Sequence, residues 1–190
     1  MTKSNFLYSF CLVCTLLIFA SCSKDDSVNP DAVSGKLTCK VDGQDWKAET
    51  INSIMIKTDQ TGVWSKSLNI TGTGPDGEFF TIIITDLRNA SEGECLSSEE
   101  YFSIGDDRVE DNYIESANGI DYASGSSGTF TYTDQTITLP QGGSVIVGEC
   151  SDKRVSGTFS FSLIYFDENF DMIEIEVTDG KFEDVAYTVQ

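Results

Sequence analysis

Two residue types in this chain could carry out chemistry, carboxylates and cysteines. The 190 residues include 31 Asp and Glu, six Cys and no His. Without histidine there is no Ser-His-Asp or Cys-His nucleophilic site and no histidine-ligated metal. Glycoside hydrolysis needs only two carboxylates about 5–10 Å apart, but with so many acids such a pair arises by chance. We therefore expect a protein that is not an enzyme and binds no cofactor. A carboxylate-dependent glycoside hydrolase is the less favoured alternative.

Carboxylates crowd one segment, residues 92–121, where no strand pattern is visible. Its acids are Glu92, Glu94, Glu99, Glu100, Asp106, Asp107, Glu110, Asp111, Glu115 and Asp121. Long irregular segments are often binding loops, and closely spaced carboxylates can supply the six to eight oxygens that calcium takes. The spacing does not match an EF-hand loop. We interpret the segment as a solvated acidic edge and predict no metal site, leaving calcium or glycan binding as alternatives.

The N-terminal segment predicts a secreted protein. Lys3 is followed by an almost uncharged apolar run of 14 residues, 6–19, and then by the small residues Ala20 and Ser21. These are the parts of a secretory signal peptide, and the run is shorter than the about 20 residues of a membrane-spanning helix. We expect cleavage after residue 21, with Cys22 next in the chain.

The junction resembles a bacterial lipoprotein lipobox, with Phe19 where Leu is usual. The resemblance implies that Cys22 becomes the mature N-terminus and carries acyl chains such as palmitate; an ordinary secretory signal with a free Cys22 is the alternative. Two or more chains anchor a protein stably where one does not. Ser23, Lys24, Asp25 and Asp26 resemble the lipoprotein export signal of Bacteroidetes, which implies an outer-membrane lipoprotein exposed at the cell surface. The alternative is a solvated linker.

Charge and cysteine content constrain the mature chain further. Loss of residues 1–21 removes only Lys3 among charged residues, so the net charge of −19 becomes −20, which argues against binding nucleic acid through a basic patch. Three cysteines then remain besides Cys22, in an oxidising compartment. Cys39 fits a buried thiol in a strand. A disulfide between Cys95 and Cys150 is possible, and three unpaired thiols are the alternative.

The rest of the sequence must position these residues, and its pattern is that of strands. Residues 22–35 are predicted to be the lipidated cysteine and a flexible acidic tether, and residues 36–190 a single β-domain. Alternating or apolar runs bounded by turn residues predict strands at 36–41, 53–57, 67–73, 79–85, 127–133, 136–139, 145–147, 156–165, 172–177 and 181–188. Run 79–85 is apolar on both faces, which predicts a central strand covered on both sides.

Turn residues separate these strands. Asp42-Gly43 predicts a hairpin, with Trp46 on the return strand as a core residue. Turns are also expected at residues 140–143 and at Asp179-Gly180. We find no helix with convincing caps and periodicity. The fold class is therefore all-β: an antiparallel β-sandwich or a meandering β-barrel, with a lipocalin-like barrel as the alternative.

A second resemblance covers both ends of this domain. The Val41-Asp42-Gly43 turn leading to Trp46, the run Ser156-Gly157-Thr158-Phe159-Ser160-Phe161 and residues 179–185 resemble a family of uncharacterised Bacteroidetes surface lipoproteins. The resemblance implies the location and fold class and adds no chemistry. We expect a non-catalytic, lipid-anchored module that binds an extracellular glycan or protein. The alternative is a structural or assembly subunit of an envelope complex.

Overall fold

The computed structural model describes residues 35–190 apart from positions 61, 89, 92 and 135. The predicted signal peptide, the lipid-bearing Cys22 and the export signal of Ser23, Lys24, Asp25 and Asp26 lie outside the described residues. The first strand begins at Lys36, where the sequence predicted ordered structure to begin. The described residues fall in one compact unit.

Two large sheets form the domain, which confirms the predicted sandwich. The first sheet contains, in spatial order, β2 (Gln44–Lys47), β1 (Lys36–Val41), β12 (Met172–Ala186), β11 (Arg154–Phe166), β10 (Leu139–Ser151) and β6 (Glu100–Phe102). The second contains β13 (Thr188–Val189), β3 (Thr50–Gln60), β4 (Val63–Thr73), β5 (Phe79–Asp86) and β9 (Gly125–Thr131). Every pairing is antiparallel except that of β13 with β3. Neither sheet closes on itself, so both barrel alternatives, the meandering barrel and the lipocalin-like barrel, are wrong.

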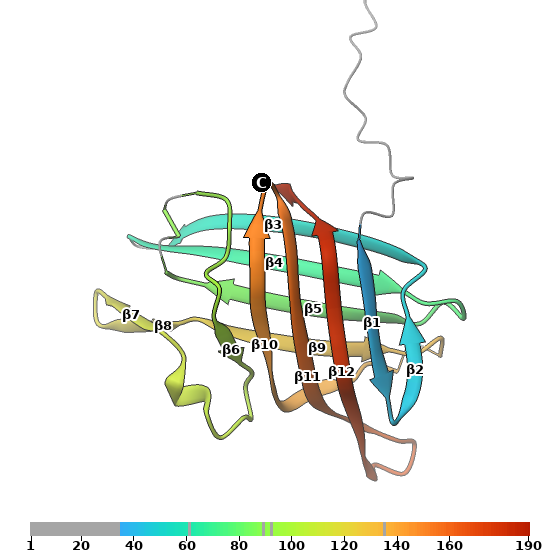
Figure 1. Ribbon diagram of the computed structural model, residues 1–190. Helices are drawn as coiled ribbons and strands as arrows, with labels where there is room; N and C mark the ends of the chain where they lie inside the picture. The colour runs from blue at the N-terminus through green and yellow to red at the C-terminus, as the bar shows by residue number, and fades with distance from the viewer. Residues whose placement is uncertain (1–34, 61, 89, 92, 135) are drawn as a thin grey trace, which may run out of the picture. The chain divides into compact units, whose positions relative to one another are not determined.

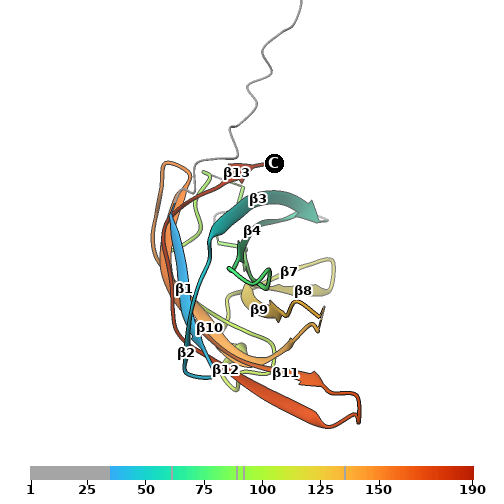
Figure 2. The ribbon, with the colours of Figure 1, turned by 90° about the vertical axis from the view of Figure 1, so that its right-hand side faces the viewer.

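The two sheets face each other as two layers, and the strands of one run across those of the other (Figures 1 and 2). The chain passes between the layers at short corners. Only Ala48 and Glu49 separate β2 from β3, and only Tyr187 separates β12 from β13. Such crossed packing places the core where the inward faces overlap.

Aromatic rings fill this core. Phe80 of β5 stacks on Phe159 of β11, with ring centroids 5.2 Å apart. Trp46 is 9% exposed, packs edge-on against Phe80 and Phe130, and donates its indole N–H to Glu78 Oε1 at 2.7 Å. The prediction that Trp46 is a core residue is confirmed.

Two similar runs, Ser127-Gly128-Thr129-Phe130 and Ser156-Gly157-Thr158-Phe159, lie in different sheets. Gly128 lies in β9 and Gly157 in β11. A Cβ atom at Gly128 would collide with the ring of Phe161. One at Gly157 would collide with the backbone carbonyl of Ile146 and the ring of Phe182. Each glycine leaves room for an aromatic ring, which explains the likeness without a duplication.

Four sequence predictions about strands are wrong. Of the predicted strand 136–139, only Leu139 lies in a named strand, at the start of β10. Residues 140–143 and Asp179-Gly180 make no turns; they lie inside β10 and β12, where the register shifts as at a β-bulge. Glycine and a left-handed aspartate suit a bulge as well as a turn. The run 79–85 is β5, an interior strand covered on one face only: Phe80, Ile82 and Ile84 are buried, while Phe79 is 39% and Ile83 38% exposed on the other face.

The acidic region between β5 and β9 has more structure than its sequence indicated. It contains β6, a short 3-10 helix (Val109–Asp111) and a hairpin of β7 (Ile114–Ala117) and β8 (Ile120–Ala123). In the part of the chain that the structure describes, no helix has the length and apolar character needed to span a membrane.

Candidate binding surface

The outer face of the five-stranded sheet carries no charged side chain on four of its strands. The register groups its outward residues into rows across β3, β4, β5 and β9: Thr50–Thr73–Phe79–Thr131, Asn52–Thr71–Thr81–Thr129, Ile54–Asn69–Ile83–Ser127, Ile56–Ser67–Thr85–Gly125 and, on β3 and β4 alone, Thr58–Ser65. We call this set the uncharged face. It is notable in a chain of net charge −19.

Simple alternation produces this face. In β4 the even-numbered residues from Lys66 to Gly72 are buried, and the odd-numbered residues between them are half-buried. Cross-strand hydroxyls pair on the outside, with Thr71 Oγ1 and Thr81 Oγ1 3.1 Å apart. Threonine and β-branched residues suit such a position. The result is a surface of hydroxyl and amide groups interrupted by isoleucine and one exposed phenylalanine.

A cleft of about 300 Å³ opens along one side of the uncharged face. Its floor is outward residues of β5 and β9, and its far wall is the loop after β6. The described residues that line it are Ile83, Thr85, Phe102, Ile104, Val109, Asn112, Ala123, Ser124, Gly125, Ser126 and Ser127. None of them is charged. A mostly apolar cleft with a few polar groups is the usual form of a small-molecule site.

Two polar anchors hold the cleft wall in place. The Asn112 side chain brackets Phe102, accepting its backbone N–H and donating to its carbonyl, both at 3.0 Å. Asp106 accepts N–H groups of Arg108 and the backbone N–H of Gly143, which links the loop to β10. These bonds, led by those from the Arg108 side chain, lower the pKa of Asp106 to about 2. Because its polar groups are paired, the wall is preorganised.

The β7–β8 hairpin borders the same face at the end of β4 and β5. A smaller depression of about 120 Å³ lies there, lined by Gln60, Val63, Ser65, Thr85, Leu87, Tyr122 and Ala123. Val63 is only 2% exposed. The uncharged face is thus bounded by loops at one end and open over its centre, where a ligand could lie.

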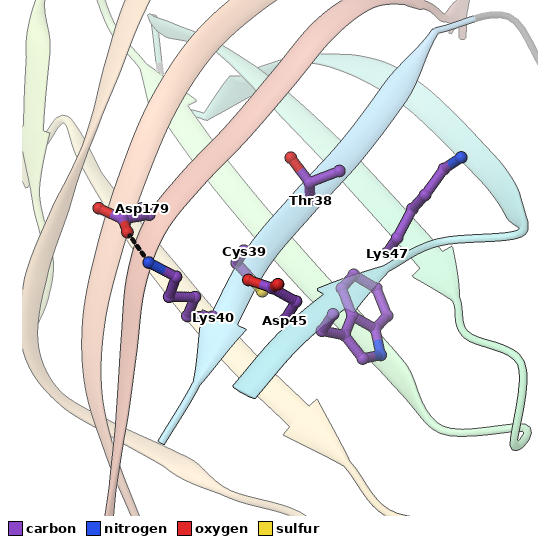
Figure 3. Close-up of a pocket in the computed structure, with 7 residues that line it drawn as sticks. Thr38, Cys39, Lys40, Asp45, Lys47 and Asp179 are labelled. Atoms are coloured by element: carbon purple, nitrogen blue, oxygen red, sulfur yellow. Dashed lines mark hydrogen bonds and ion pairs between the residues drawn. The ribbon is translucent and has the colours of Figure 1, made fainter. Parts of the chain in front are cut away.

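The outer face of the six-stranded sheet is different, because β1, β2 and β12 carry charged side chains there, although the outward residues Ser156, Thr158, Ser160 and Ser162 of β11 are uncharged. A depression of about 320 Å³ on this sheet is lined by Thr38, Cys39, Lys40, Asp45, Trp46, Lys47 and Asp179 (Figure 3). Lys40 Nζ is 2.7 Å from Asp179 Oδ2. Two further ion pairs, Lys36–Glu183 and Arg154–Asp184, lie on the same sheet.

This charged depression is a poor site for two-carboxylate hydrolysis. Such catalysis needs one carboxylic acid with a raised pKa. The hydrogen bond and charge of Lys40 lower the pKa of Asp179 instead. Cys39 is no nucleophile either, because it is 5% exposed and burial raises the pKa of its thiol to about 12. The prediction of Cys39 as a buried thiol is confirmed.

The structure brings Cys95 and Cys150 together at one hydroxyl. The three described cysteines are free thiols here. Cys150 Sγ lies 3.2 Å and Cys95 Sγ 3.7 Å from the Tyr187 hydroxyl, which donates to the carbonyl of Glu94 at 2.6 Å. Burial raises the pKa of the Cys150 thiol to about 11. The Cys95–Cys150 disulfide stays a prediction. The two sulfur atoms lie on the same tyrosine hydroxyl.

Sequence reasoning missed a buried charged cluster below these thiols. Lys66 is 3% exposed and donates to the carbonyl of Cys95 at 2.8 Å, and burial lowers the pKa of its ammonium. Asp86, its cross-strand partner, is fully buried and accepts the backbone N–H groups of Arg88 and Ser97. Both lie at inward positions of their strands, so the alternation could have revealed them. The cluster fixes the start of the acidic segment to the core.

The carboxylates of the acidic segment do not converge on a metal site in the described residues. Among the described residues, no group of three or more Cys, Asp or Glu is placed to hold a metal ion. Asp106 is engaged with Arg108, whose guanidinium lies 4.5 Å from the centre of the Phe102 ring. The uncharged face was also missed by sequence reasoning. The alternation of Ser, Asn and Thr at odd positions 65–73 could have indicated it.

No protein-family model, no curated protein sequence and no solved structure matches this chain, so no relative supplies a ligand for the uncharged face.

Proposed function

We propose that this protein is a lipid-anchored, non-catalytic module at the cell surface that binds a neutral glycan on its uncharged face. The location rests on the apolar leader, on Cys22 and on the acidic residues after it. The glycan rests on one observation, the uncharged face with its neutral cleft.

The chemistry of this face suits sugars. Sugar rings present hydroxyls, which pair with Ser, Thr and Asn side chains, and apolar C–H faces, which pack on Ile54, Ile83 and Phe79. A surface without charge needs no counter-ion and loses little solvation on contact with a neutral ligand. The net charge of the rest of the chain repels anionic polysaccharides. A neutral, hydroxyl-rich ligand is therefore the best fit.

A glycan array tests this proposal directly. The purified lipidated protein in detergent is probed with neutral oligosaccharides and with sialylated or sulfated ones. We expect binding confined to neutral glycans. A blank across the neutral set, or binding to anionic glycans alone, would contradict the proposal.

A matched pair of variants locates the site. Thr81→Glu places a charge at the centre of the uncharged face, and Thr158→Glu adds the same charge on the other sheet, opposite Lys181. We expect Thr81→Glu to weaken binding at least tenfold and Thr158→Glu to leave it unchanged. If the two variants weakened binding equally, the uncharged face would not be the glycan-binding site.

A further inference from the structure

The tip of the β11–β12 hairpin is a second exposed feature, separate from the uncharged face. In Figure 2 this hairpin extends beyond the rest of the domain. Three apolar side chains at its end are largely exposed: Phe170 by 87%, Met172 by 63% and Phe166 by 56%. Phe166 and Met172 are cross-strand partners, and Phe170 lies in the turn between them.

A neighbouring strand extends this apolar surface. Leu139 begins β10, is 53% exposed and pairs with Ile164 of β11. Ile164 and Phe166 are two residues apart and so point to the same side of β11. We call Leu139, Phe166, Phe170 and Met172 the tip strip. Single exposed apolar residues are ordinary, but a contiguous group marks an interaction site.

The turn holds Phe170 outward in a strained conformation. Its φ is 64°, in the left-handed region that bulky residues avoid. The Asp167 carboxylate accepts the backbone N–H groups of Asn169 at 2.8 Å and Asp171 at 2.9 Å. The backbone N–H groups of Asp167 and Phe170 are also bonded, to the carbonyls of Asp171 and Asp167. An aromatic anchor on a pinned turn loses little freedom on binding.

Charge identifies the kind of partner. Asp167 and Glu168 precede Phe170 closely in the turn, and Asp171 follows it directly. Together with the net charge of −19, they repel an anionic lipid surface and a second copy of this acidic chain. A protein with an apolar pocket rimmed by Lys or Arg complements them. The tip is also far from the start of the domain, because Lys36 pairs with Glu183 near the opposite end of β12.

We propose that the tip strip docks into a basic-rimmed apolar pocket of a partner protein, with Phe170 as its central anchor. This docking is independent of glycan binding on the uncharged face.

Phe170→Asn separates docking from folding. Asparagine tolerates a left-handed backbone, so the variant loses the ring and keeps the turn. Random peptides displayed on phage are selected for binding to the lipidated full chain. Trp64→Asn, at an exposed aromatic residue outside both the uncharged face and the tip strip, is the matched control. We expect selected peptides to carry an aromatic or aliphatic residue beside Lys or Arg, and to bind Phe170→Asn at least tenfold more weakly while binding Trp64→Asn normally. Their affinity falls as salt is raised.

Three results would overturn the proposal. The first is that selected peptides lack basic residues or bind Phe170→Asn as well as the parent. The second is that a Cys22→Ala chain, which lacks the anchor, sediments with phosphatidylethanolamine–phosphatidylglycerol vesicles in a Phe170-dependent way. The third is Phe170-dependent self-association in sedimentation velocity.

Discussion

The two outer faces of this sandwich share a backbone architecture and differ in chemistry. On the six-stranded sheet, Lys36, Lys40 and Arg154 each pair with a carboxylate of β12. On the five-stranded sheet, the rows from Thr50 to Thr131 and from Asn52 to Thr129 contain no charge. Both faces need only polar or small residues at outward positions, so the fold does not require this difference.

This comparison separates what folding demands from what is free to serve binding. The buried positions behind both faces are mostly apolar, with Lys66 and Asp86 of the five-stranded sheet as charged exceptions, since alternation commits every second residue to the core. The outward positions are under no such demand. A charged face keeps an acidic protein soluble, whereas an uncharged face in the same chain adds nothing to solubility. The proposed glycan binding would give the uncharged face a role.

The largest effect on stability is expected from comparing an inward and an outward residue of the five-stranded sheet. Phe80→Ala removes a fully buried ring that stacks on Phe159 and should lower the free energy of unfolding by about 3–5 kcal/mol. Phe79→Ala, one residue earlier and 39% exposed, should change it by less than about 1 kcal/mol. Urea unfolding followed by the fluorescence of the two tryptophans, Trp46 and Trp64, measures both. Equal losses would mean that Phe79 is also part of the core.

The next effect concerns the thiols at the end of both sheets. If Cys95 and Cys150 form a disulfide in the exported protein, reduction should lower the free energy of unfolding by about 2–4 kcal/mol. Cys95→Ser should be insensitive to reductant. Thiol titration of the denatured lipidated protein should find one free thiol, that of Cys39. Three free thiols would contradict the pairing.

A pH-dependent effect tests the loop that walls the cleft. The pKa of Asp106 is about 2, below its ordinary value of 3.8, so its charged form stabilises the fold above about pH 4. That contribution is lost as the pH falls from about 4 to about 2. Asp106→Asn should therefore have a lower melting temperature than the parent at pH 7, with the gap closing towards pH 2. Asp107→Asn, whose carboxylate is 97% exposed, should show little gap at any pH.

The smallest effect is expected on the charged face. Lys40→Met removes the partner of Asp179, but the two side chains are 41% and 67% exposed, and exposed ion pairs contribute little. Calorimetry should find almost no change in melting temperature, and glycan binding should be unaltered. A large destabilisation would mean that the charged face is held by its ion pairs, which would weaken the contrast with the uncharged face.

Much of the fold could be predicted from local pattern. The hairpin at Asp42-Gly43 is one example, since both residues take a positive φ, 49° and 77°, as a tight hairpin turn requires. The same reasoning was wrong at Asp179-Gly180 and Gly143, because a bulge uses the same residues as a turn. Only the pairing of β12 with both β1 and β11 decides that the strand continues.

The sequence by itself determined the all-β class, the start of the domain at Lys36 and the burial of Cys39 and Trp46, because alternation and turn chemistry act over a few residues. Only the tertiary structure decided that the outward residues of β3, β4, β5 and β9 form one uncharged face, that Cys95 meets Cys150 at Tyr187, and that Phe170 stands at an exposed tip. These are relations between strands far apart in the chain. They depend on sheet order and register, which the core sets through contacts that no short stretch of sequence contains.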